Sequence, residues 1–417
     1  MNTAEPATDA QQTAIPFLGL APFLRVSIAG IDLKPISQEM LANVEADAEN
    51  ANLWMNLSVL MQCIGQRDLG LAMQDQALAL QRLYHLAAAV QPATLRLLMI
   101  VAPGDLSANT PLDCLLENSD IDMDFYYASA AAPLPVPMPE HDALVVAVGE
   151  SDATHAVLAA LEQALAHWPK PIINLPQHIP ATGRTTASLH LQDVPGLLIP
   201  PTLRVARSAL QDIATGAHSL PALCAGCDFP IILRPVGSHA GIGLERIDSP
   251  AEIGNYLLQV DAAELYLSRF IDYSGPDGLF RKFRIALLDG AAFACHMAVS
   301  SHWMVHYLNA GMYDDAQKRA EEAHFMQHFD AFAQRHRVAL EAIYSRTGLD
   351  YLCIDCAETP DGQLFIFEID PAMVVHAMDP EEQFPYKKQP IQKLQTAFRD
   401  FLLRRIASHP AHSSADR

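Results

Sequence analysis

Three carboxylate side chains near the C-terminal end of the chain could hold a divalent cation. Two short apolar runs flank the turn sequence Thr-Pro-Asp-Gly at 359–362, which predicts a β-hairpin. Asp355 lies on the first strand of this hairpin. Glu368 and Asp370 are two residues apart on the second strand, so their side chains project from the same face. Oxygen ligands without His or Cys suit Mg²⁺, which one or two carboxylates and substrate phosphates usually hold. An exposed strand face that is merely acidic explains the pattern equally well.

A glycine-rich loop could bind phosphate. The predicted strand 229–233 runs into Arg234 and then into 235–243, which contains three glycines and a serine. Such a loop exposes backbone N–H groups that can surround a phosphate, and Arg234 adds a fixed charge with two-point geometry. A plain hairpin turn accounts equally well for the glycines. A second hairpin, 280–288 with 291–299, begins with a basic cluster of Arg281, Lys282 and Arg284.

Composition limits the kinds of partner. The formal net charge is −21, from 27 basic and 48 acidic residues in a chain of 417, so nucleic acid and anionic membranes are poor partners. No apolar run is long enough to cross a bilayer, and the polar N-terminus does not resemble a signal peptide. Seven scattered cysteines fit a reducing cytoplasm better than a disulfide framework. The length predicts two or three folded domains.

The N-terminal part is predicted to be helical. Residues 1–14 are polar and expected to be disordered, and 15–35, with three prolines, are expected to be extended or a short strand. The stretch 37–90 has a helical pattern, with Trp54, Ser58 and Gly65 placed as in one tetratricopeptide hairpin. Since about three repeats are normally needed for stability, this resemblance favours a helical cap or an oligomer surface over a peptide-binding array.

The next section predicts a parallel α/β sheet. Buried strands are expected at 95–101, 123–128, 143–149 and 172–175, and a helix at 153–168 that Ser151 or Asp152 could cap. No G-x-G-x-x-G follows the first strand, so no dinucleotide site is expected. Further helices are expected at 185–192, 203–215, 315–347 (one or two, ended by Gly348) and 391–406, and a strand at 265–271.

Two C-x-x-C pairs, one at 224–227 and one at 353–356, are about 125 residues apart. That spacing does not match a zinc ribbon, so these cysteines are expected to be small buried residues.

Residues 172–400 resemble an ATP-grasp ligase. The resemblance lies in the order of the motifs: Arg184 before a short helix, Ile-Pro-Pro-Thr at 199–202, 229–235 with its glycine loop, the hinge strand 266–271, and Phe-Glu-Ile-Asp-Pro at 367–371. It implies an α+β ATP-grasp domain at 181–408 with a lid subdomain near 203–272. A Rossmann-like domain at 93–180, a helical extension at 15–92 and a disordered tail at 409–417 complete the expected organisation.

The resemblance also implies roles for individual residues. Arg184 and Arg234 would contact the α- and β-phosphates of ATP, with Lys282 as a further phosphate ligand, and Arg284 would stabilise an acyl-phosphate. Asp355, Glu368 and Asp370 would hold two Mg²⁺ ions. The lid over the phosphates would comprise Ser238, His239, Gly241 and Gly243, and the adenine hinge Ser268, Arg269, Phe270 and Ile271.

Three features depart from the family pattern, one of which is that no acidic group for the ribose is obvious, with Asp272 and Asp277 as candidates. Arginine stands at positions 184 and 234, where the family usually has lysine, and Asp370 stands where it usually has asparagine. Two segments could contact the substrate: the loop after the second hairpin and the segment that follows the acidic strand. The candidate residues are His302, His306, Asn309 and His376. Structural histidines explain these positions equally well.

These observations predict a cytoplasmic ATP- and Mg²⁺-dependent ligase that joins a small-molecule or peptide carboxylate to an amine or thiol through an acyl-phosphate. A homodimer is expected, and the N-terminal helices could recruit a carrier or peptide. The alternative is a non-catalytic or regulatory ATP-binding protein whose helices bind a partner.

Overall fold

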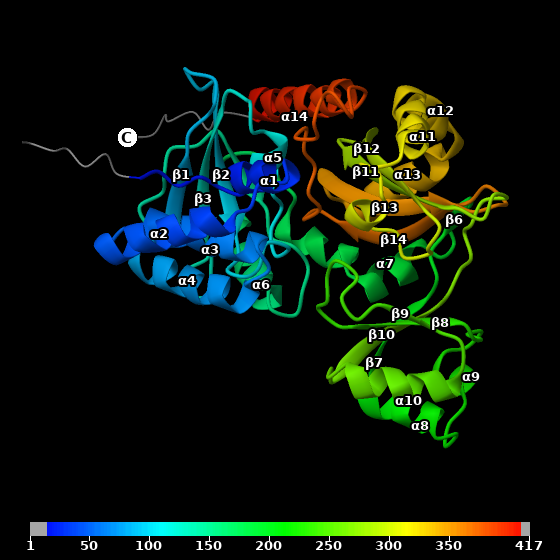
Figure 1. The fold of residues 1–417 in the computed structure, drawn as a ribbon. Helices are drawn as coiled ribbons and strands as arrows, with labels where there is room; N and C mark the ends of the chain where they lie inside the picture. Colours follow the sequence, from blue (N-terminus) through cyan, green and yellow to red (C-terminus); the bar gives the residue numbers. More distant parts are fainter. Residues whose placement is uncertain (1–14, 410–417) are drawn as a thin grey trace, which may run out of the picture.

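The computed structural model describes residues 15–409, so the predictions of disorder at 1–14 and 410–417 lie outside the described residues. It has a mixed α/β fold with three sheets, which confirms the predicted fold class. In Figure 1 the N-terminal helices and the first sheet form one side of the molecule, and the other two sheets form the opposite side. Within the described range, no helix is long and apolar enough to cross a membrane.

Four helices cover the N-terminal side: α1 (Ala21–Ile28), α2 (Lys34–Ala46), α3 (Ala51–Cys63) and α4 (Arg67–Leu80). The expectation of an extended segment at 15–35 was wrong, because Pro22 and Pro35 stand in the first turns of α1 and α2, where proline is tolerated. Helices α3 and α4 pack as a hairpin. Its likeness to a tetratricopeptide repeat stays a prediction.

The first sheet has the strand order β1-β3-β2-β4-β5, and all its pairs are parallel except β1 with β3. Its strands are β1 (Leu83–Leu86), β2 (Leu95–Val101), β3 (Ile121–Tyr127), β4 (Ala143–Val146) and β5 (Ile172–Ile173), with α5 (Leu112–Leu115) after β2 and α6 (His155–Leu165) after β4. Strand β1 corrects the prediction of helix through residue 90, since Tyr84 is fully buried against the sheet. Thr154, and not Ser151 or Asp152, stands at the N-cap of α6.

The second sheet is antiparallel, with the order β7-β10-β8-β9. Its strands are β7 (Thr202–Ala206), β8 (Ile231–Pro235), β9 (Glu245–Ile247) and β10 (Glu264–Arg269), and its helices are α8 (Arg207–Ala214), α9 (Leu220–Leu223) and α10 (Pro250–Gln259). The single helix expected at 203–215 was wrong, because its first residues pair with β10 as strand β7. Cys224 and Cys227 form a disulfide, which corrects the prediction that they are simply small buried residues.

The third sheet has the order β12-β11-β13-β14-β6 and carries the predicted acidic hairpin. Its strands are β6 (Leu197–Leu198), β11 (Phe280–Leu288), β12 (Ala291–Ser300), β13 (Tyr351–Glu358) and β14 (Leu364–Asp370). The helices around it are α7 (Arg184–Leu191), α11 (Ala316–Gln327), α12 (Phe329–Arg335), α13 (Arg337–Thr347) and α14 (Lys388–Ser408), with 3-10 turns η1 (Pro176–Thr182) and η2 (Tyr307–Asn309). Three helices therefore occupy 315–347, and Gly348, with φ +68°, ends the last of them as predicted.

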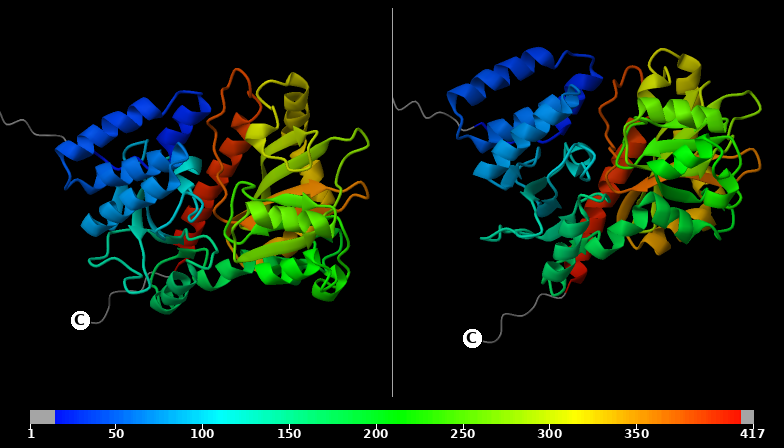
Figure 2. Two further views of the ribbon diagram at one scale, coloured as in Figure 1. Left: turned by 60° about the horizontal axis from the view of Figure 1, so that its bottom comes forward. Right: turned by 90° about the horizontal axis from the view of Figure 1, so that it is seen from below.

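A shared core joins the first and third sheets. Helix α14 lies between them in both views of Figure 2, and its residue Phe398 packs in one apolar cluster with Met99 of β2 and Tyr351 of β13. The side-chain amide of Asn174 is hydrogen-bonded in both directions to the backbone of Tyr351, at 2.8 and 2.9 Å. Because both contacts are buried, they resist separation of the two sheets.

Candidate active site

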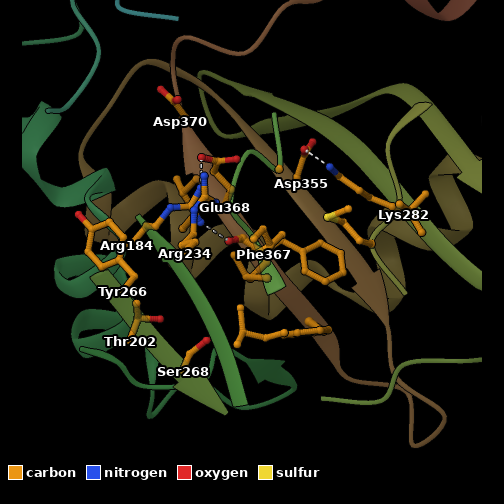
Figure 3. A pocket seen from close by; sticks show the side chains of 18 of the residues that line it. Arg184, Thr202, Arg234, Tyr266, Ser268, Lys282, Asp355, Phe367, Glu368 and Asp370 are labelled. Carbon is orange, nitrogen blue, oxygen red and sulfur yellow. Dashed lines mark hydrogen bonds and ion pairs between the residues drawn. The ribbon is translucent and has the colours of Figure 1, made fainter. Parts of the chain in front are cut away.

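A cavity of about 410 Å³ lies between the second and third sheets, and side chains from both project into it (Figure 3). Fourteen of the predicted site residues line it: Arg184, Arg234, His239, Gly241, Ser268, Arg269, Phe270, Ile271, Lys282, Arg284, His306, Asp355, Glu368 and Asp370. Tertiary folding thus gathers residues that are up to 186 positions apart in the chain (370 − 184).

Two arginines approach the acidic strand from opposite elements. Arg184, the first residue of α7, donates from Nη1 to the carbonyl of Phe367 at 3.1 Å and forms an ion pair with Glu368. Arg234, at the end of β8, is only 9% exposed and donates to the Ser238 hydroxyl and carbonyl. Burial and the charge of Arg184 lower the pKa of Arg234 to about 10. The two like charges repel each other in a closed site, and a bound anion would offset this repulsion.

Asp355 is enclosed by cations. It is 2% exposed, and its carboxylate accepts from Arg284 Nε at 2.8 Å and Nη2 at 3.0 Å, with Lys282 Nζ at 2.7 Å. Burial alone would raise the pKa of Asp355, but the charges of Arg284 and Lys282 hold it well below its ordinary value. The cation expected among the buried acids is therefore, at this position, supplied by the protein.

Glu368 and Asp370 leave the same face of β14 and differ sharply in environment. Burial alone would raise the pKa of Glu368, but the charges of Arg184 and Arg234 lower it. Burial and the nearby charge of Glu368 raise the pKa of Asp370 to about 7. The Asp370 carboxylate accepts from the backbone N–H of Ala372 at 2.8 Å. A cation near this pair would relieve the repulsion that raises this pKa.

The three predicted metal ligands do not form one cluster. Among residues 15–409, no three His, Cys, Asp or Glu side chains lie close enough together to hold a metal ion. Figure 3 shows the reason, since Asp355 points to Lys282 while Glu368 faces Arg184 and Asp370 stands apart. Glu368 is paired with Arg184, and Asp355 with Lys282 and Arg284, so each would have to exchange a cationic partner before it could hold a magnesium ion.

The backbone conformation of the glycine loop requires glycine at several positions, and the loop covers the cavity. Gly237, Gly241 and Gly243 have φ values of +73°, +75° and +65°, which other residues rarely adopt. A Cβ at Gly241 would lie 3.3 Å from the sulfur of Met304 and 3.4 Å from His306 Nε2, so the loop rests against the segment after β12.

Two predicted members of this loop do not line the cavity. Ser238 holds Arg234 through its hydroxyl, and its side chain also donates to the carbonyl of Pro235 at 2.9 Å. The carbonyl of Gly243 accepts from the Tyr256 hydroxyl at 2.7 Å, and its α-carbon lies against the ring of Pro235. Both residues therefore shape the loop from behind.

Of the four predicted substrate contacts, only His306 lines the cavity. Burial and the charge of Lys282 lower its pKa, which favours the neutral ring. His302 is exposed, and its Nδ1 accepts from the N–H of Met304 at 3.2 Å. His376 makes the same contact with Met378, and Asn309 accepts from the N–H of His306 at 2.9 Å. These three side chains therefore stabilise local turns.

Sequence reasoning missed several lining residues. Tyr266 lies in the inner strand β10, Thr202 begins the edge strand β7, and Trp303 comes from the loop after β12. Ser107 and Val374 line the end of the cavity that is nearest to the first sheet. Ser107 could have been found, because it follows the carboxyl end of a predicted parallel strand, where such sheets bind ligands. Thr202 and Tyr266 could have been found as well, because they belong to the Ile-Pro-Pro-Thr motif and to the hinge strand, whereas Trp303 and Val374 carry no signal in the sequence.

Comparisons with known proteins found similar solved structures at low sequence identity. No protein-family model matches the sequence, and no curated protein matches it. Similar solved structures include a D-alanine–D-alanine ligase from Bacillus anthracis, which is 11% identical, with 75% of this chain and 98% of that chain covered and a TM-score of 0.43. A RimK domain ATP-grasp protein from Sphaerobacter thermophilus is 12% identical over 74% and 99% of the two chains, with a TM-score of 0.41. The ATP-grasp ligase PsnB, solved with a precursor peptide and AMPPNP, is 12% identical over 76% and 99%, with a TM-score of 0.39.

One cavity brings together several of the segments on which the ATP-grasp resemblance is based. A glycine loop and a hinge strand on one sheet face an acidic hairpin on another across a single cavity. The likeness to the solved structures concerns the fold.

Proposed function

We propose that this protein is an ATP-dependent ligase that joins a carboxylate to an amine or thiol through an acyl-phosphate and releases ADP and phosphate. The observation that carries the proposal is the charge pattern of one cavity. Five cations, Arg184, Arg234, Arg269, Lys282 and Arg284, line it together with three carboxylates. In a chain with a net charge of −21, this concentration of cations favours a bound polyphosphate.

The cavity offers an apolar end and a charged end for a nucleotide. Ile199, Ile232 and Phe367 line the apolar end next to the hinge residues 268–271, which suits a flat base whose edge bonds to backbone groups. Arg184 and Arg234 would then contact the α- and β-phosphates, with Lys282 further along. The glycine loop would cover the phosphates with backbone N–H groups.

Glu368 and Asp370 would hold Mg²⁺ together with the phosphates, and Asp355 would join them if Lys282 and Arg284 turned toward the nucleotide. When bound, the ion neutralises charge on the phosphate oxygens. The raised pKa of Asp370 supports this assignment, because burial and the charge of Glu368 disfavour its carboxylate form and a bound cation would offset both effects.

The chemistry proceeds in two substitutions. A substrate carboxylate oxygen attacks the γ-phosphorus, a new O–P bond forms, and the bond to the bridging oxygen breaks as ADP leaves. The amine or thiol then attacks the acyl carbon, loses a proton, and expels phosphate. Arg284, whose Nη1 donates to the carbonyl of Val374 at 3.0 Å, has N–H groups at the end of the cavity where the acid would lie.

The acid and the nucleophile are small molecules or a peptide. The precursor peptide in the PsnB structure supports a peptide substrate. A cytoplasmic location, a homodimer and recruitment of a carrier by the N-terminal helices also stay predictions.

ADP release tests the proposal. Purified protein is incubated with ATP and Mg²⁺, amino acids and dipeptides are supplied as acids, and hydroxylamine traps acyl-phosphates as hydroxamates. Binding of Mg²⁺·AMP-PNP is measured by calorimetry on wild type and on Arg234→Met. Acid-dependent ADP and hydroxamate formation, lost in Arg234→Met, is the expected result. Nucleotide binding without turnover on any acid would favour the regulatory alternative, and absence of binding would refute both.

A further inference from the structure

The loop between β2 and α5 forms one end wall of the candidate site. Ser107 of this loop lines the cavity, as does Val374, whose carbonyl is bonded to Arg284. The neighbouring Ala108 accepts a hydrogen bond from the N–H of Gly149, at the end of β4, at 2.8 Å. The loop therefore stands at the carboxyl ends of two parallel strands, on the side where an acid or its nucleophile would enter.

A side chain of the N-terminal helices holds this loop. Gln74 of α4 is 5% exposed, its Nε2 donates to the carbonyl of Gly104 at 3.0 Å, and its Oε1 accepts from the N–H of Gly104 at 2.8 Å. One side-chain amide thus satisfies both backbone groups of a loop residue, as a neighbouring strand would. Removing it would leave two backbone groups without partners.

Gly104 itself has little freedom to move away from Gln74. Its φ is +155°, and a Cβ at this position would lie 2.8 Å from the Cβ of Ala108. The loop packs tightly here, so the amide of Gln74 fixes the turn that leads to Ser107.

A second contact reaches from the start of α4 to the same loop. Arg67 Nε donates to Asp105 at 2.9 Å, and Asp105 accepts from the hydroxyl of Ser107 at 2.5 Å and from its N–H at 3.1 Å. Since Arg67 is largely exposed, this ion pair contributes less than the buried contacts of Gln74. Ser107 of this loop and His239 of the glycine loop line the same cavity.

Helix α4 is a firm support for these contacts. Its Gly70 approaches α3 so closely that a Cβ would lie 2.5 Å from Gln62 Cγ and 2.9 Å from the carbonyl of Ser58. Met73 and Ala77 of α4 are buried on either side of Gln74. A shift of α4 relative to the first sheet would therefore be passed to Gly104.

We propose that α4 positions the loop 104–108 for binding of the acid and its nucleophile, with Gln74 as the positioning residue, so that the N-terminal helices are part of the ligand site. The proposal rests on the proposed function, since it assigns this end of the cavity to the acid and its nucleophile. It also gives the helices a role that requires no partner protein.

Gln74→Ala and Gln76→Ala form a matched pair for the test. Gln76 lies on the same helix and is exposed. Its side chain makes no hydrogen bond to any of residues 15–409. Three quantities are compared: hydrogen exchange of the amides 102–110, the Kd for Mg²⁺·AMP-PNP, and the half-saturating concentration of an amino-acid mixture in the ADP-release assay with hydroxylamine.

For Gln74→Ala we expect exchange in 102–110 to rise at least tenfold and half-saturation by the acids to rise at least fivefold, with the nucleotide Kd within twofold of wild type. Gln76→Ala should match wild type in all three. In Gln74→Glu the carboxylate can accept from Gly104 N–H but cannot donate to its carbonyl, so exchange should fall toward the wild-type rate as pH is lowered and the carboxyl regains its proton.

Two outcomes would overturn the proposal: exchange in 102–110 that is equal in the two alanine variants, or a nucleotide Kd that worsens in parallel with saturation by the acids. If Gln74→Ala does not fold, Arg67→Gln should give the same pattern with smaller changes. A wild-type protein that releases no ADP with the mixture would count against the ligase reaction on amino acids, while the exchange comparison would still decide whether Gln74 holds the loop.

Discussion

Replacing Asp355 by asparagine tests the electrostatic balance of the site. Asp355 accepts three charge-assisted contacts from Arg284 and Lys282 and is almost fully buried. Asparagine keeps the volume but removes the charge, and its NH₂ group would face a donor. Breaking a buried ion pair by removing one partner costs about 3–5 kcal/mol. That is a large part of the roughly 5–15 kcal/mol by which folded domains are stable.

Urea unfolding, followed by tryptophan fluorescence at pH 7, measures this loss. Asp330→Asn is the control, because the side chain of Asp330 is 94% exposed and its one ion pair is 3.9 Å long. We expect the control to lie within about 0.5 kcal/mol of wild type. A cost below about 1 kcal/mol for Asp355→Asn would refute the reasoning, because it would mean that Arg284 and Lys282 do not depend on this carboxylate.

The difference in stability between wild type and Asp355→Asn should depend on pH in a defined way. The pKa of Asp355 is depressed in the folded state, so its contribution is fully present above the unfolded pKa, near 3.9, and is lost as pH falls toward the folded value. The difference between wild type and Asp355→Asn should therefore stay constant from about pH 7 to pH 5 and narrow below about pH 4. A difference that narrows between pH 7 and pH 5 would contradict this assignment.

Three further substitutions test the site and a buried ion-pair cluster outside it. Gly241→Ala should weaken Mg²⁺·AMP-PNP binding about tenfold in calorimetry, because it adds both strain and a contact with Met304, whereas Gly226→Ala, with the same φ of +75° but open space around it, should leave binding unchanged. Lys387→Met should lower the free energy of unfolding by about 3–5 kcal/mol, because it leaves the buried acids Glu322 and Asp379 without their cationic partner. As a control, Lys388→Met, at an exposed position, should change the free energy of unfolding by under about 0.5 kcal/mol. The raised pKa of Asp370, about 7, means that wild type loses stability as pH rises from about 4 to 7; Asp370→Asn should abolish this loss in thermal melts, and an unchanged pH slope would contradict it.

Local patterns in the sequence were sufficient for the elements that carry the site. The hairpin of β13 and β14 was predictable because two apolar runs enclose a turn signal, and period-two geometry then places Glu368 and Asp370 on one face. Arg234 and the glycine loop were predictable for the same kind of reason, since a strand followed by several glycines is a local signal.

Errors arose where tertiary packing overrides local preference. Residues 203–206 were predicted to begin a helix but belong to strand β7, because β10 lies beside them and supplies hydrogen-bond partners. Residues 83–86 become β1 for a similar reason, as they pair with the edge of β3. The disulfide of Cys224 and Cys227 depends on backbone geometry that composition does not reveal.

The sequence alone determined which charged groups this protein would bring to a site, because their types and their places at strand ends are written in the chain. Only the tertiary structure decided how they pair. Asp355 is taken by Lys282 and Arg284, Glu368 by Arg184, and Asp370 remains with a raised pKa. The physical reason is that pairing energies depend on distance and burial, and both are set by contacts between segments far apart in the sequence. For the same reason, no local pattern could show that Gln74 of α4 holds the wall of the cavity.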